Sequence, residues 1–324
     1  MKNIHHIITL MAAMATLLAS CEKTIDFSGE IIDNKTPVMI SLPETDSTWT
    51  VRLTNSRFFL SSGSITTIDN ATFSLEVNGQ QMGNSATNLG KGMYQMGYIP
   101  RSGDTITLNV MIPNRGELKA GCRIPARPTI SEISFDWDTT TYIYPYDEDT
   151  TRYSYGDVKV KFIISDPGNE KNYYMLRLAQ RRMEYSYSGD DYTWGDWYYH
   201  YLTVEDNVLF NPNISNEIIE IGDAENEGNS ILFTDERING KDHQIAFSFY
   251  YNSQDNYQYR LEFYSLSRDS YYFFKSRKAA ENQDDLTGIF SEPVQLYTNV
   301  DGGIGILGGI ASKKFILKEI SYQE

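Results

Sequence analysis

The sequence predicts a mainly β chain, with an N-terminal immunoglobulin-like sandwich followed by a larger antiparallel β domain that carries one short helix. Three observations support this prediction. Among 324 residues there are 24 Tyr, 15 Phe and 4 Trp, and aromatic residues favour strands. Apolar and polar residues alternate over short stretches, as they do in half-buried strands. Turn sequences such as Asn-Gly and Asp-Pro-Gly separate these stretches.

Residues 1–20 have the features of a signal peptide that ends at a cysteine. Lys2 supplies a positive charge, residues 7–18 are mostly apolar and too few to span a bilayer, and Leu18-Ala19-Ser20 leads directly to Cys21. This pattern resembles the bacterial lipoprotein signal, in which the cysteine is acylated and the chain is cut before it. We therefore expect Cys21 to be the lipidation site. Several acyl chains on this cysteine would anchor the protein firmly. An ordinary signal peptide with a chance cysteine is the alternative.

The first predicted domain spans residues 36–124 and follows a polar tether at 21–35. Its first strand signal alternates Val38, Ile40 and Leu42 with Met39 and Ser41. A later alternating stretch ends at Asn78-Gly79, a pair that accepts the positive φ angles of a type I′ hairpin turn. Half-buried strands at this spacing predict the immunoglobulin-like sandwich.

Pro125 and Pro128 interrupt the strand pattern, and we place the domain boundary there. The second predicted domain, residues 128–324, is longer and richer in aromatic residues. Its alternating stretches are expected to form an antiparallel meander with one buried face. Within it, the strands at 245–251 and 257–263 are expected to be joined by the polar turn between them.

One stretch of the second domain departs from the β pattern. Ser267-Arg268-Asp269 fits the start of a helix, because Ser is a good N-cap and an acid favours the positive end of a helix. Residues 270–282 contain alanines and basic residues that suit a helix and its C-terminal end. We expect a short helix that packs on the sheet through Tyr271 and Phe274.

The charge and the rare side chains limit the classes of function. The formal net charge is −15, which argues against nucleic acid as a partner because its phosphates would be repelled. Only His200 and His243 remain once a signal peptide is removed, which restricts histidine-based catalysis and zinc sites. Cys122 is then the one other cysteine, and we expect it to be a buried structural thiol. We expect no metal and no cofactor.

Residues Gly303 to Gly308 fit the dinucleotide-binding fingerprint by letter but not by context. The fingerprint needs a helix after its glycines and an acid about 20 residues further on. Only 16 residues follow Gly308, and 314–320 has a strand pattern. We expect these glycines to allow a tight turn or a close approach of two chain segments.

Four segments of the chain occur in a recognisable combination. They are the motif ending at Cys21, Arg123-Ile124-Pro125, the segment Asp166 to Tyr174, and a tail with Phe290-Ser291-Glu292-Pro293, Asn299 to Gly305 and Gly308. Together they resemble a family of Bacteroidetes outer-membrane lipoproteins that is classed only as a domain of unknown function. The resemblance covers nearly the whole mature chain, and the glycine-rich tail is its most specific part.

The resemblance implies a location and a partner. Genes of that family tend to lie beside those of TonB-dependent outer-membrane transporters, which implies an accessory role at the outer membrane, with a lipid anchor. We expect the cell surface, and the periplasmic face stays open as the alternative. The family offers no catalytic residues to carry over.

Residues 185–201 are the richest candidate for a binding site, because aromatic side chains continue there through glycines that break the strand pattern. Aromatic faces beside carboxylates suit sugar rings, peptides or cations. The candidate contacts are Tyr192, Trp194, Trp197, Tyr198, Asp190 and Asp191. We expect their rings to lie at the surface of a loop. The alternative is two strands joined by a tight turn, whose rings merely cover the sheet.

These observations favour a lipid-anchored binding protein, accessory to a TonB-dependent nutrient transporter, rather than an enzyme. A carboxylate-dependent hydrolase of glycans or peptides is one alternative, because that chemistry needs only two acids at a suitable separation and the sequence has 43. A structural partner without a small ligand is the other.

Overall fold

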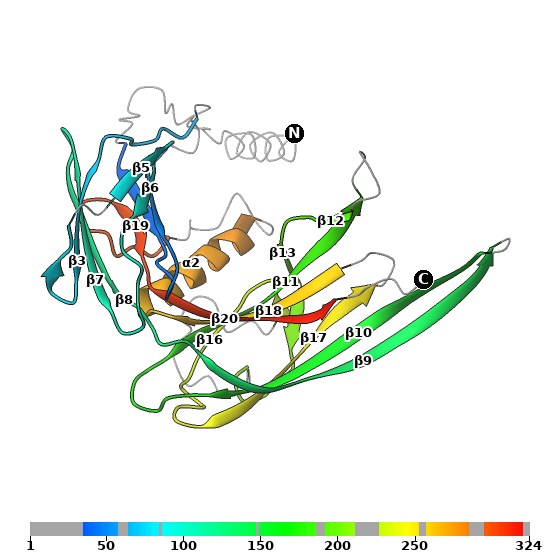
Figure 1. Cartoon of the computed structure of the whole chain (residues 1–324). Coiled ribbons are helices and arrows are strands. Elements are labelled where there is room, and N and C mark those ends of the chain that lie inside the picture. Colours follow the sequence, from blue (N-terminus) through cyan, green and yellow to red (C-terminus); the bar gives the residue numbers. More distant parts are fainter. Residues whose placement is uncertain are drawn as a thin grey trace, which may run out of the picture. The chain divides into compact units, whose positions relative to one another are not determined.

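The computed structural model describes residues 35–57, 64–83, 86–146, 149–185, 192–210, 227–252, 257–284 and 295–319 (Figure 1). The chain divides into two units, one made of residues 1–35 and 57–61 and the other of 36–56 and 62–324. All elements below belong to the second unit. Among the described residues the chain is mainly β and contains the helix α2 (Arg268–Asp284), which confirms the predicted class. Within these residues, no helix combines the length and the apolar character needed to cross a membrane.

Two sheets in the N-terminal half form the predicted sandwich, here called the first sandwich. Its sheets have the strand orders β19-β1-β2-β6-β5 and β4-β3-β7-β8. With letters assigned in chain order and β4 as strand C′, β1 to β8 follow the immunoglobulin orders A-B-E-D and C′-C-F-G. The strands are β1 (Pro37–Ser41), β2 (Thr50–Asn55), β3 (Thr72–Val77), β4 (Gln80–Gln81), β5 (Ala86–Gly90), β6 (Met93–Met96), β7 (Thr105–Ile112), β8 (Gly116–Arg123) and β19 (Ile304–Leu307).

Side chains from both sheets fill the core of the first sandwich. Leu53 of β2, Leu75 of β3 and Leu108 of β7 have no exposed surface. On β1 the buried side chains are Met39 and Ser41, whereas Ile40 is 39% exposed. Successive side chains of a strand point to opposite faces, so the Val38 and Ile40 set that marks this strand in the sequence lies on its outer face.

The hairpin between β3 and β4 has the predicted turn. Asn78 and Gly79 have φ angles of 52° and 79°, and Val77 pairs with Gln80. Positive φ at both central positions is the mark of a type I′ turn. The side chain of Asn78 strengthens this corner, since its Nδ2 donates to Asp104 Oδ1 at 2.8 Å and its Oδ1 accepts from the Thr105 N–H at 2.9 Å.

A second pair of sheets forms the second sandwich. Its strand orders are β15-β14-β17-β10-β9 and β12-β11-β18-β20, with β13 and β16 also paired to β11. Rings from the two sheets meet between them, as Phe162 of β10 does with Phe263 of β18 at 5.6 Å between centroids. The strands are β9 (Thr129–Tyr146), β10 (Asp149–Ser165), β11 (Tyr173–Tyr185), β12 (Tyr192–Trp194), β13 (Tyr198–His200), β14 (Leu202–Val204), β15 (Glu227–Gly228), β16 (Ile231–Thr234), β17 (Asp242–Asn252), β18 (Tyr257–Leu266) and β20 (Ile310–Glu319).

The predicted meander is wrong for β17 and β18. These strands follow each other along the chain, yet β17 pairs with β10 and β14 while β18 pairs with β11 and β20. Because the two strands lie in opposite sheets, both bury rings in the same core. The ring centroids of Phe249 and Tyr259 are 4.9 Å apart there. The prediction of one buried face also fails for β18, because Tyr264 and Leu266 are buried on its other side, in a cluster that includes Tyr271 of α2.

The helix α2 is confirmed, with the predicted cap and the predicted contacts. The Ser270 N–H donates to Ser267 Oγ at 3.2 Å, which satisfies one of the free donors at the helix start. Tyr271 is buried against Tyr173 of β11 at 5.0 Å between ring centroids, and Phe274 packs on the same cluster. At 17 residues the helix is longer than the predicted range.

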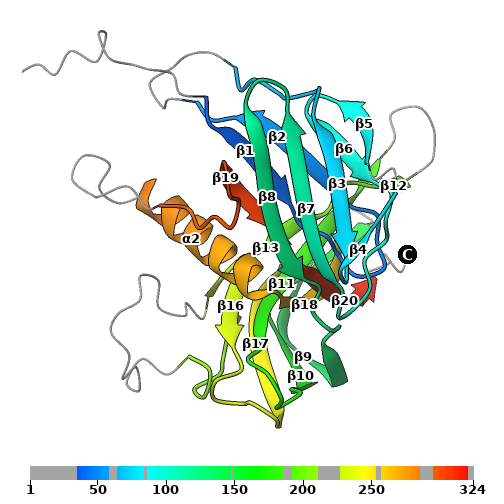
Figure 2. The ribbon, with the colours of Figure 1, turned by 90° about the vertical axis from the view of Figure 1, so that its left-hand side faces the viewer.

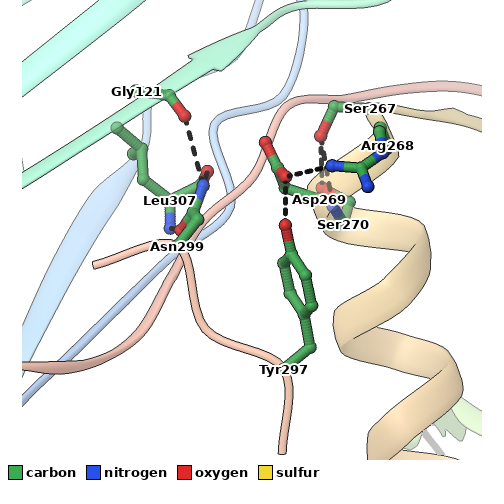
Figure 3. Close-up of polar contacts among 8 residues, drawn as sticks. All are labelled: Gly121, Ser267, Arg268, Asp269, Ser270, Tyr297, Asn299 and Leu307. Carbon is green, nitrogen blue, oxygen red and sulfur yellow. Dashed lines mark hydrogen bonds and ion pairs between the residues drawn. The ribbon is translucent and has the colours of Figure 1, made fainter. Parts of the chain in front are cut away.

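The chain returns to the first sandwich near its C-terminal end. We expected all of residues 128–324 in the second domain, but β19 pairs in parallel with β1, in the sheet of the first sandwich (Figure 2). Asn299 fixes this return, because its Nδ2 donates to the carbonyls of Gly121 and Leu307 while its Oδ1 accepts from the Leu307 N–H (Figure 3). Beside it, the Tyr297 hydroxyl donates to Asp269 of α2 at 2.5 Å.

The glycines of this tail sit where two chain segments touch, as predicted. A Cβ added to Gly305 would lie 1.9 Å from the carbonyl oxygen of Met39, and one added to Gly309 would lie 2.3 Å from that of Arg123. Residues with any side chain would therefore push the strands apart. The segment after these glycines is the strand β20 and not a helix, so the dinucleotide-binding context is missing here.

Candidate ligand-binding face

One face of the sheet around β11 collects arginines and aromatic rings. Leu176 and Leu178 of β11 point into the core of the second sandwich, so the alternating residues Arg177, Ala179 and Arg181 share the opposite face. On β18, the register partners of these three are Glu262, Arg260 and Gln258. The same sheet therefore brings three arginines from two strands onto one face.

A break in the neighbouring strand brings two tryptophans to this face. β12 and β13 both pair with β11, and residues 195–197 between them leave the ladder. The Gly195 N–H still donates to the Arg182 carbonyl at 2.9 Å, which keeps the break close to β11. Such irregularities re-aim a side chain, and here Trp197 and Trp194 both contact Arg181.

The result is an alternating stack, here called the arginine–tryptophan ladder, of Trp194, Arg181, Trp197 and Arg260. The guanidinium carbon of Arg181 lies 5.0 Å from the ring centroid of Trp194 and 4.6 Å from that of Trp197. The guanidinium carbon of Arg260 lies 3.9 Å from the Trp197 centroid. These are cation–π distances, and all four side chains are half-buried. The ladder is thus an ordered surface feature outside the packed cores.

Hydrogen bonds to side chains of β18 fix the two arginines. Arg181 Nε donates to Gln258 Oε1 at 2.7 Å, and Arg260 Nε donates to Glu262 Oε1 at 2.7 Å. Glu262 is buried, and its other oxygen accepts from the Tyr264 hydroxyl at 2.5 Å. Burial together with this carboxylate raises the pKa of Tyr264, which keeps the phenol protonated.

A third arginine lies beside the ladder on the same face. The guanidinium carbon of Arg177 is 4.4 Å from the ring centroid of Tyr199 and 5.5 Å from that of Phe274 on α2. Its Nε is buried and has no hydrogen-bond partner among the described residues.

The structure brings together only part of the predicted set of contacts. Trp194 lies on β12, a strand paired with β11, and not in the predicted loop, whereas Trp197 lies in the short break between β12 and β13. Tyr198 is 44% exposed but pairs with Gln180, which puts it on the face opposite Arg181. Tyr192 lies on β12 and pairs with Tyr185 of β11. Asp190, Asp191 and Cys21 lie outside the described residues.

The three arginines are absent from the predicted contacts, which follow the aromatic residues of 185–201. The signal for them is the two-residue period of a strand along 173–185. In that period Arg177 and Arg181 share one face with Tyr173, whereas Leu176 lies on the other.

The described cysteine and histidines lie apart from this face. Cys122 is buried as predicted, and burial raises the pKa of its thiol to about 12. Burial lowers the pKa of His200, whose Nε2 lies 2.9 Å from the Tyr250 carbonyl oxygen. His243 Nε2 lies 2.6 Å from Asp206 Oδ2. Nowhere in the described ranges do three or more His, Cys, Asp or Glu side chains gather in a way that could hold a metal ion.

Comparison with known proteins gives a family and little else. The sequence model of the domain of unknown function DUF4249 matches residues 24–316. No curated protein matches the chain. Among solved structures, the chain is similar to the crystal structure of collagen adhesin (CNA) from S. aureus, at 11% identity over 88% of this chain and 96% of that one. The TM-score of 0.17 is too low to indicate a shared fold. Because the family model spans most of its length, the chain belongs to the DUF4249 family, a domain whose function is unknown.

Proposed function

We propose that the protein is a lipid-anchored binding protein of the outer membrane that assists a TonB-dependent transporter, and that it is not a hydrolase. The membrane part of the proposal rests on the signal that ends at Cys21 and on the resemblance described above. The binding part rests on the arginine–tryptophan ladder.

The ladder supports a binding role because it holds large aromatic side chains partly exposed to water on the face of a sheet. Two indoles and two guanidiniums are ordered on a sheet face, where Tyr199 beside them is 46% exposed. Tryptophan, tyrosine and arginine are the residues that dominate the energy of interfaces.

The surroundings of the ladder favour binding over hydrolysis. Hydrolysis of a glycoside needs two carboxyl groups that reach the substrate. Glu262, the carboxylate hydrogen-bonded to Arg260 of the ladder, is buried and also held by Tyr264. Its oxygens are therefore engaged within the protein.

Capture from native membranes tests this proposal. The full chain with Trp194→Ala and Trp197→Ala together should lose the transporter or its cargo from a pull-down that the wild type gives, because each interface ring is worth about 2 kcal/mol or more. Tyr250→Ala is the matched control, since Tyr250 is 53% exposed on β17, away from the ladder. Equal capture by the double variant and the wild type would contradict a role for this face.

A further inference from the structure

The ladder uses the ring faces of its tryptophans on the protein's own arginines. Trp197 has Arg181 at 4.6 Å and Arg260 at 3.9 Å from its ring centroid, and Trp194 has Arg181 at 5.0 Å. A ring face that carries a guanidinium is not open to stack on a sugar or to attract a second cation. Each indole therefore spends at least one ring face on positioning an arginine, and Trp197 contacts two arginines.

Stacking leaves the edges of the guanidinium groups for a ligand. The planar group meets a ring with its face and presents its N–H donors along its edge. Arg181 spends one donor, Nε, on Gln258. Within the described part of the chain, its terminal nitrogens have no acceptor and no carboxylate lies within 4.0 Å of them.

The charge of this face is not balanced by the described chain. Arg123, Arg260 and Arg277 each have a carboxylate within 4.0 Å. Among the described residues, neither Arg177 nor Arg181 has one, although the chain as a whole carries a net charge of −15. A half-buried cation without a counter-charge is unfavourable, so this patch of positive charge suits an anionic partner.

The spacing of the arginines indicates an extended ligand. Arg177 and Arg181 are four residues apart on β11, which at about 3.3 Å per residue puts their Cα atoms roughly 13 Å apart. Arg260 lies opposite Ala179, between them. A single small anion spans no more than one of these positions, whereas a chain with several acidic groups reaches all three.

The position on a sheet face distinguishes two kinds of extended polyanion. A peptide bound to a sheet gains most of its affinity from main-chain hydrogen bonds at an edge strand. The face of β11 and β18 offers side chains only, and guanidinium edges pair with carboxylates in a bidentate way. We propose that this face binds an acidic oligosaccharide through the edges of Arg181 and Arg177, with Trp194 and Trp197 as positioning residues. This inference rests on the proposed function, since it names the ligand class of the same face.

Titration calorimetry on the full chain in detergent tests the inference. The probes are an oligogalacturonate, the same oligosaccharide with its carboxyls methyl-esterified, and a polyglutamate peptide. We expect the acidic sugar to bind, the ester to bind at least about tenfold more weakly, and Arg181→Gln or Arg177→Gln to weaken the acidic sugar about tenfold each, the loss of one charge-assisted contact. Arg277→Gln, on the exposed side of α2, is the matched control and should change nothing.

Variants of Trp197 distinguish a positioning role from a purely structural one, and the three probes distinguish failure of this inference from failure of the proposed function. Trp197→Leu should weaken the acidic sugar while Trp197→Phe restores most of the affinity, because a ring again holds the guanidiniums. If the ester binds as well as the acid and Arg181→Gln has no effect, the charge inference is overturned, yet the proposed function stands. If polyglutamate binds and the sugar does not, the ligand class is wrong. If no probe binds, the inference is overturned, and the membrane pull-down decides the proposed function separately.

Discussion

Replacing Gly305 by alanine should detach β19 from β1. Gly305 has a φ of 122°, where a residue with a side chain is strained by about 1–3 kcal/mol. The added Cβ would lie 1.9 Å from the oxygen and 2.8 Å from the carbonyl carbon of Met39, both backbone atoms. No rotamer change can relieve such a contact, so one of the two strands has to move.

The cost follows from what β19 buries. Ile306 and Leu307 have no exposed surface, and burying such a side chain is worth about 1.5–3 kcal/mol each. Complete detachment of β19 would therefore lower the free energy of unfolding by about 3–6 kcal/mol, which is the upper limit for this substitution. For a chain of 324 residues, with an unfolding entropy of about 2.1 cal/mol/K per residue, that corresponds to a fall in Tm of roughly 4–9 °C.

Thermal unfolding and hydrogen exchange by mass spectrometry measure this effect. Gly305→Ala should lower Tm and speed amide exchange in the peptide that contains β1, while Gly83→Ala, at a glycine with nothing within 4 Å of the added Cβ, should do neither. A Gly305→Ala chain with wild-type Tm and wild-type exchange in β1 would refute the close approach on which this reasoning depends.

Four further predictions address the anchor, the thiol, the helix cap and a buried acid. Cys21→Ala should abolish labelling by a radioactive fatty acid, and equal labelling of variant and wild type would contradict the lipoprotein signal. Cys122→Ser should leave binding unchanged with a modest loss of stability, and the native thiol, with its pKa raised to about 12 by burial, should resist a maleimide at pH 8 until the chain unfolds. Ser267→Ala removes the N-cap of α2 and should cost about 1 kcal/mol in denaturant unfolding. Burial raises the pKa of Asp235 above its usual value, so the folded chain holds that proton more tightly and stability falls as the pH rises through the raised pKa. Asp235→Asn should therefore have the higher Tm at pH 7, with a difference that shrinks on acidification; a constant difference from pH 4 to 7 would argue against this.

Features that depend on a few neighbouring residues could be predicted from the sequence. Asn78-Gly79 sets a type I′ turn because both residues tolerate positive φ, and Ser267 caps α2 because its hydroxyl lies next to the free helix donors. The immunoglobulin-like class also followed from alternating stretches and their spacing, because half-buried strands of this kind pack as two sheets around one core.

Features that depend on distant segments could not be predicted. Alternation identifies β17 and β18 as strands but does not say which sheet each one joins. β1 is apolar on both faces, so its sequence does not decide whether Met39 or Ile40 is buried. The candidate site shows the same limit, because Trp197 could be picked from composition while its partners Arg181 and Arg260 come together only through the pairing of β11 with β18.

The parallel pairing of β19 with β1 has a consequence for the order of synthesis. Val38 pairs with Ile304, 266 residues later in the chain. At about 5–20 residues per second, the free edge of β1 waits roughly 13–53 s for its neighbour after it has been made. An exposed strand edge invites pairing with another chain. A nascent or truncated chain that lacks residues 304–307 should therefore be prone to exchange strands with a second molecule. Once the C-terminal tail has been made, β19 pairs with β1 and covers this edge.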